Sequence, residues 1–217
     1  MRASERAYAG LVEEIQSGAL APGAVIGEVE QAARLGVSRT PMREAIARLT
    51  ADGLVQQQSA RVLVVAGFDA DHIRALFEVR RALEESAARL AALRGDAGAF
   101  RALAADFRAA HPESGAGAAD AYYALIARFD AAIDDAVQND YLAQALRPIR
   151  AHLARARRLT RDDAARLRDS VAEHALIAEA IAARDPGLAA HATHLHLHPA
   201  LAAVLAAIGG ATDAAHD

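Results

Sequence analysis

The sequence predicts a mostly α-helical protein in which three helices and a small β-hairpin are followed by an antiparallel bundle of six helices. Apolar residues recur at helical spacing on both sides of a break at residues 66–69. Two short apolar runs, Leu54-Val55 and Val62–Val65, precede this break and favour a hairpin. No strand pattern follows it. We therefore expect two domains, residues 1–66 and residues 67–217.

Composition and charge narrow the class of protein. The chain has 217 residues, of which 53% are hydrophobic, so both domains can bury a core. Its net charge of −4 argues against a non-specific coat of nucleic acid, whose whole surface would be basic. Positive charge is instead local, because Arg34–Arg48 contains four arginines and one glutamate. Such a distribution suits a sequence-specific binder.

The sequence also excludes several locations and kinds of site. There is no cysteine, so neither a disulfide framework nor a thiolate metal site is expected. No apolar run approaches the roughly 18 residues of a membrane span, and residues 1–5 lack the apolar core of a signal peptide. We expect a cytoplasmic protein with no membrane partner.

Three helices are expected before the hairpin. The first carries Ala7, Leu11 and Ile15 at helical spacing and ends at Gly18. The second runs from about Glu28 to Leu35. A turn at Gly36 then leads to a third helix that ends at Asp52-Gly53.

The third helix has one apolar face and one basic face. Ser38 is suited to cap it, and Pro41 is tolerated in its first turn. Its apolar stripe consists of Met42, Ala45, Ile46 and Leu49. Arg39, Arg43 and the hydroxyls of Ser38 and Thr40 gather at its N-terminal end and outer face. An ordinary solvated helix would share this pattern, but so would a helix that reads the major groove of DNA.

Three helices and a hairpin form a winged helix-turn-helix, and here the sequence resembles the GntR family of bacterial transcription regulators. The similarity rests on Ser17-Gly18, Pro22-Gly23, Gly36–Pro41, Arg43–Ala45 and Asp52–Val55, with Leu49 between the last two. The resemblance implies that Ser38, Arg39, Thr40 and Arg43 contact double-stranded DNA.

Three positions depart from the pattern of this family. Val29 replaces a DNA-contacting arginine, Gln31 replaces a core leucine, and Ala60 replaces a glycine at the tip of the wing. Contact between the wing and DNA is therefore left open, although Arg61 could still reach a minor groove or a phosphate.

The second domain is expected to consist of helices alone. Breaks at Gly95-Asp96, His111–Gly117, Asn139-Asp140, Thr160 and Asp185–Gly187 separate them. The predicted helices span residues 69–94, 96–109, 117–137, 139–158, 161–183 and 186–207. We expect an antiparallel bundle able to hold a ligand.

This domain resembles the FCD ligand-binding domain of the FadR subfamily. The similarity is carried by Leu76–Glu84, by Phe129 with Asn139 and Leu142, and by residues from Glu173-His174 to Arg184-Asp185. Six helices favour the shorter, VanR-like branch of the subfamily.

The resemblance implies a divalent metal bound by one aspartate and three histidines. The expected aspartate position is Ile126, which cannot bind a metal, and the first histidine position is Asp130. His174 and His196 remain. Asp130, His174 and His196 could hold Zn²⁺, Mn²⁺, Ni²⁺ or Fe²⁺. Alternatively the metal is lost and these three side chains bind the effector directly.

Arginines of the bundle are candidates for binding a small organic acid. Arg80 could meet a carboxylate in the pocket, or could pair with Glu84 one turn along its helix. Arg150 lies on a helix expected to line the bundle, as do Arg155 and Arg157. A stripe of His191, His194 and His198 is more typical of a solvated helix face.

The leading hypothesis is a ligand-responsive transcription regulator. Such proteins are most often repressors, and this one would bind a pseudo-palindromic operator as a homodimer under control of a small carboxylate effector. An alternative is a metal-dependent enzyme that uses Asp130, His174 and His196, with the winged helix as an appendage. The sequence has no His-Glu-x-x-His motif, which disfavours an enzyme. A third alternative is a winged helix that contacts only proteins.

Overall fold

A computed structural model describes residues 2–67, 69–115, 117–161 and 163–213. The chain forms two compact units, of which the first contains the residues up to Asp69 and the segment Pro148–Ala156. The second contains Ala70–Arg147 and the residues from Arg157 onwards. Positions used in the sequence interpretation that lie outside the described part include Phe68 at the expected domain boundary, Ala116 in the break at His111–Gly117 and Asp162 in the fifth bundle helix.

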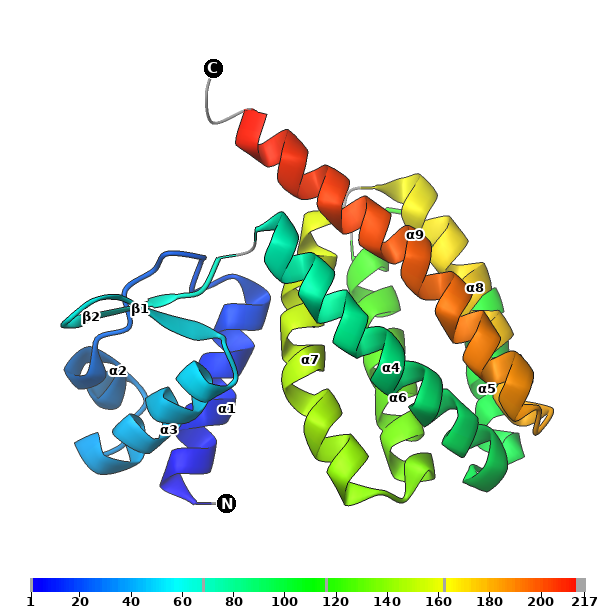
Figure 1. Cartoon of the computed structure of the whole chain (residues 1–217), viewed down its shortest axis with the longest axis horizontal. Coiled ribbons are helices and arrows are strands. Elements are labelled where there is room, and N and C mark those ends of the chain that lie inside the picture. The colour runs from blue at the N-terminus through cyan, green and yellow to red at the C-terminus, as the bar shows by residue number, and fades with distance from the viewer. Residues whose placement is uncertain (1, 68, 116, 162, 214–217) are drawn as a thin grey trace. The chain divides into compact units, whose positions relative to one another are not determined.

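The first unit has the expected order of three helices and a hairpin (Figure 1). Its elements are α1 (Ala3–Ser17), α2 (Glu28–Arg34), α3 (Arg39–Ala51), β1 (Val55–Ser59) and β2 (Val62–Val65). Gly36 has a φ of 61°, a left-handed conformation that glycine adopts at no steric cost, and it turns the chain from α2 into α3.

Helix α3 buries the stripe that the sequence predicts. Met42, Ala45, Ile46 and Leu49 all lie in the core of the first unit, where they meet Leu11 of α1. Ser38 occupies the N-cap position, but within the described residues its side chain makes no capping hydrogen bond, contrary to the expectation. With the apolar face buried, the basic face of α3 is exposed.

The hairpin is longer than expected. The sequence indicates a first strand at Leu54-Val55, whereas β1 begins at Val55 and continues through polar residues to Ser59. It pairs antiparallel with β2 in a register that joins Val55 to Val65 and Gln57 to Leu63. Backbone hydrogen bonds to β2 extend β1 through its glutamines. The glutamine side chains remain exposed to water, so this pairing buries no polar group.

The second unit contains the six expected helices, and no strand occurs among its described residues. They are α4 (Ala70–Arg94), α5 (Ala97–Arg108), α6 (Ala118–Val137), α7 (Asp140–Leu159), α8 (Ala164–Ala182) and α9 (Pro186–Asp213). Figure 1 shows α9 running beside α4 and α8, in agreement with the contacts between them. The residues of α7 divide between the two units.

Side-chain caps begin three of these helices, two of them at breaks that the sequence predicts and the third at Asp163, three residues after the predicted break at Thr160. Asp96 accepts a hydrogen bond from the backbone of Gly98, Asn139 from Tyr141 and Leu142, and Asp163 from Arg166. The core of the bundle is built around aromatic rings packed edge to face, including Phe107 against Phe129 at 5.4 Å between centroids.

Helix α9 is more apolar than the sequence analysis expects. In the described part of the chain, only its stretch Pro186–Gly210 is long and apolar enough to cross a membrane. One such helix is weak evidence for a span, because a core helix of a soluble protein passes the same test. Its four histidines and its packing on α4 and α8 accord with a helix of the bundle.

Candidate functional sites

The exposed end of α3 presents the residues that the sequence singles out. Ser38, Arg39, Thr40 and Arg43 are all exposed. The side chains of Arg39 and Arg43 retain 62% and 64% of their accessible surface. Hydroxyl and guanidinium groups at a helix N-terminus are donors that suit phosphate oxygens and base edges.

A carboxylate that the sequence analysis missed lies between these two arginines. Glu28, the first residue of α2, accepts a hydrogen bond from Arg39 Nε at 2.8 Å and from Arg43 Nε at 2.7 Å. The bonds to Arg43 and then Arg39 lower the pKa of Glu28 below its usual value. Its only sequence cue is an acid at the start of the helix that precedes α3.

The other two arginines of Arg34–Arg48 are held against the body of the unit. Arg34 pairs with Glu14 of α1 and with the buried amide of Gln31. Arg48 lies 3.8 Å over the ring of Tyr8. Of the four arginines in this segment, Arg39 and Arg43 are therefore the two directed away from the core.

The wing arginine lies near the same surface. Arg61 is exposed in the turn of the hairpin, and with Arg43 and Glu28 it lines a hollow of about 640 Å³. The floor of this hollow is apolar and includes Ile46 and Leu63. The structure thus brings Arg61 and Arg43 together, as a shared binding surface requires.

The bundle holds a buried polar cluster around His174. The imidazole Nδ1 lies 2.8 Å from the carbonyl oxygen of Ser170 and 3.0 Å from the hydroxyl of Tyr122. That hydroxyl donates to Ser170 Oγ at 2.8 Å. Phe107 stacks on the imidazole at 5.1 Å between centroids. Burial, and then the neighbouring His196, hold the pKa of His174 well below its usual value.

His196 is the second buried imidazole of this cluster, and its ring centroid is 4.4 Å from that of His174. Its Nδ1 lies 2.6 Å from Glu173 Oε2, and Glu173 also pairs with Arg166 at 2.7 Å. Burial, and then the surrounding guanidinium groups with Arg80 foremost, hold the pKa of His196 well below its usual value. Both histidines are therefore neutral near pH 7.

The partners of the two Nδ1 atoms fix the tautomer of each ring. A carbonyl oxygen and an ion-paired carboxylate can only accept, so Nδ1 of His174 and Nδ1 of His196 must each carry the proton. Each Nε2 then holds a lone pair, and no protein partner for either Nε2 is found in the described residues. These lone pairs can accept a hydrogen bond from a hydroxyl group or ligate a metal.

The predicted three-ligand metal set is only partly assembled. His174 and His196 come together, but Asp130 pairs with Arg157 at 3.4 Å, and Ile126 is buried in the apolar core. Across the described ranges no group of three His, Cys, Asp or Glu side chains is placed to share a metal ion. The cluster does not fit the metal that the resemblance implies.

The two predicted effector arginines occupy different units. Arg80 is buried and pairs with Glu84 at 3.0 Å, as the second of its two interpretations predicts. Arg150 belongs to the segment of α7 that groups with the first unit, whereas Arg80 belongs to the second unit. Neither Arg166 nor Glu173 was predicted as a site residue, although their spacing of seven residues places them on one helix face.

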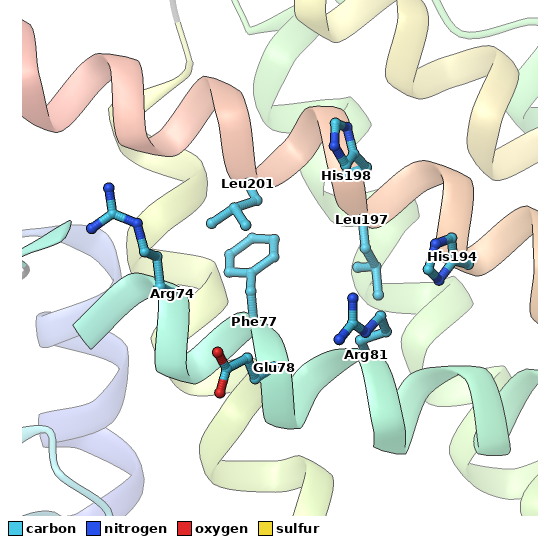
Figure 2. A pocket seen from close by; sticks show the side chains of 8 residues that line it. All are labelled: Arg74, Phe77, Glu78, Arg81, His194, Leu197, His198 and Leu201. Carbon is cyan, nitrogen blue, oxygen red and sulfur yellow. The ribbon is translucent and has the colours of Figure 1, made fainter. Parts of the chain in front are cut away.

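A groove on the surface of the bundle is the remaining hollow of interest. It has a volume of about 310 Å³. Figure 2 shows Phe77 of α4 facing Leu201 of α9, with Arg74 toward one end and His194 toward the other. It is also lined by Glu78, Arg81, Leu197 and His198. Two of the three striped histidines border it, while His191 stacks beside His194.

Comparison with known proteins identifies both units. Residues 3–65 match the bacterial regulatory proteins of the gntR family, and residues 75–199 match the FCD domain. The chain belongs to the GntR family and carries an FCD domain. It is a transcriptional regulator with a DNA-binding winged helix and a ligand-binding domain, and not an enzyme.

Relatives of known name agree with this identification. The Nta operon transcriptional regulator of Aminobacter aminovorans is 37% identical over 128 residues, which span 59% of this chain and 60% of that relative. The probable D-xylose utilization operon transcriptional repressor of Paenarthrobacter nicotinovorans is 33% identical over 203 residues, or 92% of this chain and 88% of that relative.

Solved structures share the fold. McbR/YncC of E. coli superposes with a TM-score of 0.77 at 21% identity, covering 94% of this chain and 97% of that chain. A putative GntR transcriptional regulator from Rhodococcus sp. RHA1 gives a TM-score of 0.70 at 24% identity, with the same coverage. The expected fold, a winged helix-turn-helix followed by a helical bundle, is confirmed.

Proposed function

We propose that this regulator binds a pseudo-palindromic DNA operator through α3, as a homodimer, and that a small carboxylate effector controls the binding. The observation that carries the proposal is the exposed end of α3, where Ser38, Arg39, Thr40 and Arg43 face solvent while the opposite face is buried. A helix of this kind inserts its N-terminal residues into the major groove. Arg61 on the wing would add a phosphate or minor-groove contact.

A dimer is proposed because one such helix makes few contacts. Single DNA-binding modules bury limited surface, whereas two modules related by a two-fold axis reach the affinity of a specific regulator. An effector would act by changing the arrangement of the two winged helices, provided that it binds one arrangement more tightly than the other.

Selection of duplexes from a random pool, followed by gel-shift titration, tests the DNA site. Arg39→Ala and Arg43→Ala should each weaken binding to the selected duplex by about 10-fold or more, because each removes a charged contact to a base or phosphate. Arg48→Gln is the matched control, since it removes the same charge from the same helix but at a residue held against Tyr8. Equal binding by all four proteins would contradict the proposal, as would a wild-type chain that binds no DNA.

We further propose that the effector binds the polar cluster of the bundle directly, without a metal. Guanidinium groups of Arg80, Arg157 and Arg166 act on His196, each paired with a carboxylate of the chain for which an effector carboxylate could exchange, and the two neutral imidazoles supply two lone pairs. A ligand that carries both a carboxylate and a hydroxyl group would use both kinds of group, because arginines bind carboxylates and imidazole nitrogens accept from hydroxyls. Hydroxy acids and sugar acids have this chemistry.

A thermal-shift screen of organic acids, with and without a chelator, tests this effector site. Binding at 100 times the Kd stabilises the folded chain by about 2.7 kcal/mol, or a rise in Tm of about 5–10 °C. His196→Gln should abolish the shift, while Arg81→Ala in the surface groove of Figure 2 should not. Elemental analysis decides the metal question, because one bound divalent ion per chain that is lost in the His196 variant would establish the metal site instead.

Repression and a cytoplasmic location are proposed from the relatives. The relative matched over nearly the whole chain is named a probable transcriptional repressor, so we propose repression as the mode of action. A regulator of DNA acts in the cytoplasm of a bacterium. A reporter gene placed behind the selected operator should fall in expression when the protein is present, and a rise would indicate an activator.

A further inference from the structure

We propose that Glu28 is a specificity residue that clamps the two DNA-facing arginines and suppresses their binding to non-specific DNA. The inference rests on the proposed role of α3. The carboxylate bridges two guanidinium groups one helical turn apart, with Oε1 on Arg39 and Oε2 on Arg43. A single side chain thereby sets the direction of both arginines before any DNA is bound.

The geometry leaves the useful atoms of each arginine available. Glu28 engages Nε of Arg39 and Nε of Arg43. No protein partner of their terminal Nη atoms is found in the residues that the structure covers. Paired Nη donors can still meet guanine O6 and N7, a bidentate contact that depends on the plane of the guanidinium group. Holding that plane in advance reduces the entropy lost when the base contact forms.

The charge of Glu28 acts in the opposite sense on non-specific DNA. Phosphate binding without base contacts depends on net positive charge, and the carboxylate offsets one of the two positive charges. Specific binding recovers this loss through base contacts, whereas non-specific binding does not. The clamp therefore widens the ratio between the two affinities.

Quantitative titration of Glu28→Gln against two duplexes tests the clamp. The probes are the duplex selected by the wild-type chain and a random-sequence duplex of equal length. Affinity for the random duplex should rise about fivefold near 0.1 M salt, with a salt dependence steeper by about one unit of log K per log salt. Affinity for the selected duplex should not rise in step, so the ratio between them should fall about fivefold or more.

Glu30→Gln is the matched control for charge. It makes the same change two residues along α2, and in the described part of the chain Glu30 does not pair with Arg39 or Arg43. Glu28→Asp separates charge from reach, because it keeps the charge but is one methylene shorter. That variant should leave random-duplex affinity near wild type while lowering the ratio.

The outcomes separate the clamp from the proposed DNA site. The clamp is overturned if Glu28→Gln and Glu30→Gln have the same two affinities and the same salt dependence. This holds even if Arg39→Ala and Arg43→Ala abolish specific binding. An equal loss of affinity for both duplexes in Glu28→Gln, with unchanged Tm, would also overturn it. If the two arginine variants bind the selected duplex as wild type does, the proposed role of α3 fails. In the Arg39→Ala/Arg43→Ala background, Glu28→Gln should leave the ratio between the two affinities unchanged.

Discussion

The pairs of Arg39 and Arg43 with Glu28 in the first unit and the pair of Arg80 with Glu84 in the bundle are the same chemical contact, but their burial is opposite. On α3, Arg39 and Arg43 are paired with Glu28 while more than half of each arginine side chain is exposed. In the bundle, Arg80 keeps only 5% of its accessible surface in its pair with Glu84. The same chemical contact therefore serves two different ends.

The difference follows from the cost of removing a partner. An exposed pair contributes little to the stability of the folded chain, because water replaces either partner, so its arginines can exchange the carboxylate for a phosphate or a base. A buried pair has lost its water, and breaking it leaves an uncompensated charge. The exposed pairs suit reversible recognition, and the buried pairs suit a fixed pocket.

The largest expected effect on stability is at the buried pair. Arg80→Met should lower the free energy of unfolding by about 3–5 kcal/mol, because the partly buried carboxylate of Glu84 would be left without its partner. Urea denaturation monitored by circular dichroism measures this change. Its neighbour Arg81 is exposed, and Arg81→Met should alter the free energy of unfolding by less than about 0.5 kcal/mol.

A compensating substitution sharpens this test. Arg80→Met combined with Glu84→Leu should recover most of the lost stability, since a buried ion pair replaced by packed apolar side chains is often neutral. If Arg80→Met costs no more than Arg81→Met, the two pairs do not differ in energy and the comparison between the units fails.

The second effect is a loss of stability at mildly acid pH. Burial lowers the pKa values of His174 and His196 in the folded chain. At a pH below the usual pKa of histidine, the unfolded chain therefore binds two protons that the folded chain excludes. Stability is therefore full above about pH 6.5 and falls as the pH decreases through that value. Between pH 7.5 and 5.5 the two histidines should cost about 3 kcal/mol.

Denaturation curves of His196→Gln across the same pH range isolate this contribution. The variant should lose about half of the histidine-dependent slope, whereas His198→Gln, at an exposed position, should retain the wild-type slope. Parallel pH profiles for wild type and His196→Gln would show that this imidazole titrates freely in the folded chain.

The sequence predicts elements and their faces well, since both are local properties. The stripe of Met42, Ala45, Ile46 and Leu49 specifies the buried face of α3, and caps such as Asn139 specify where bundle helices begin. The strand β1 is longer than predicted, because its polar residues are ordered by pairing with β2 and not by their own pattern.

Pairing between distant side chains is what the sequence does not predict. Glu28 lies 11 and 15 residues before its two partners, and only the angle between α2 and α3 brings the three together. Similarly, Asp130 is a possible metal ligand by its position in the sequence. Its carboxylate instead accepts a hydrogen bond from Arg157, which lies 27 residues away in the chain. The side chain of Arg150 has the right chemistry for an effector, but its segment groups with the other unit.

The smallest expected effect is at the exposed pairs. Arg39→Ala and Arg43→Ala should each change the free energy of unfolding by no more than about 0.5 kcal/mol, although both should weaken specific DNA binding strongly. Urea denaturation of the same preparations used for DNA titration measures both quantities. A loss of 2 kcal/mol or more in either variant would mean that the clamp with Glu28 supports the fold itself. If the free energy of unfolding is unchanged while DNA binding is lost, these arginines contribute to DNA binding and not to folding, as their exposure implies.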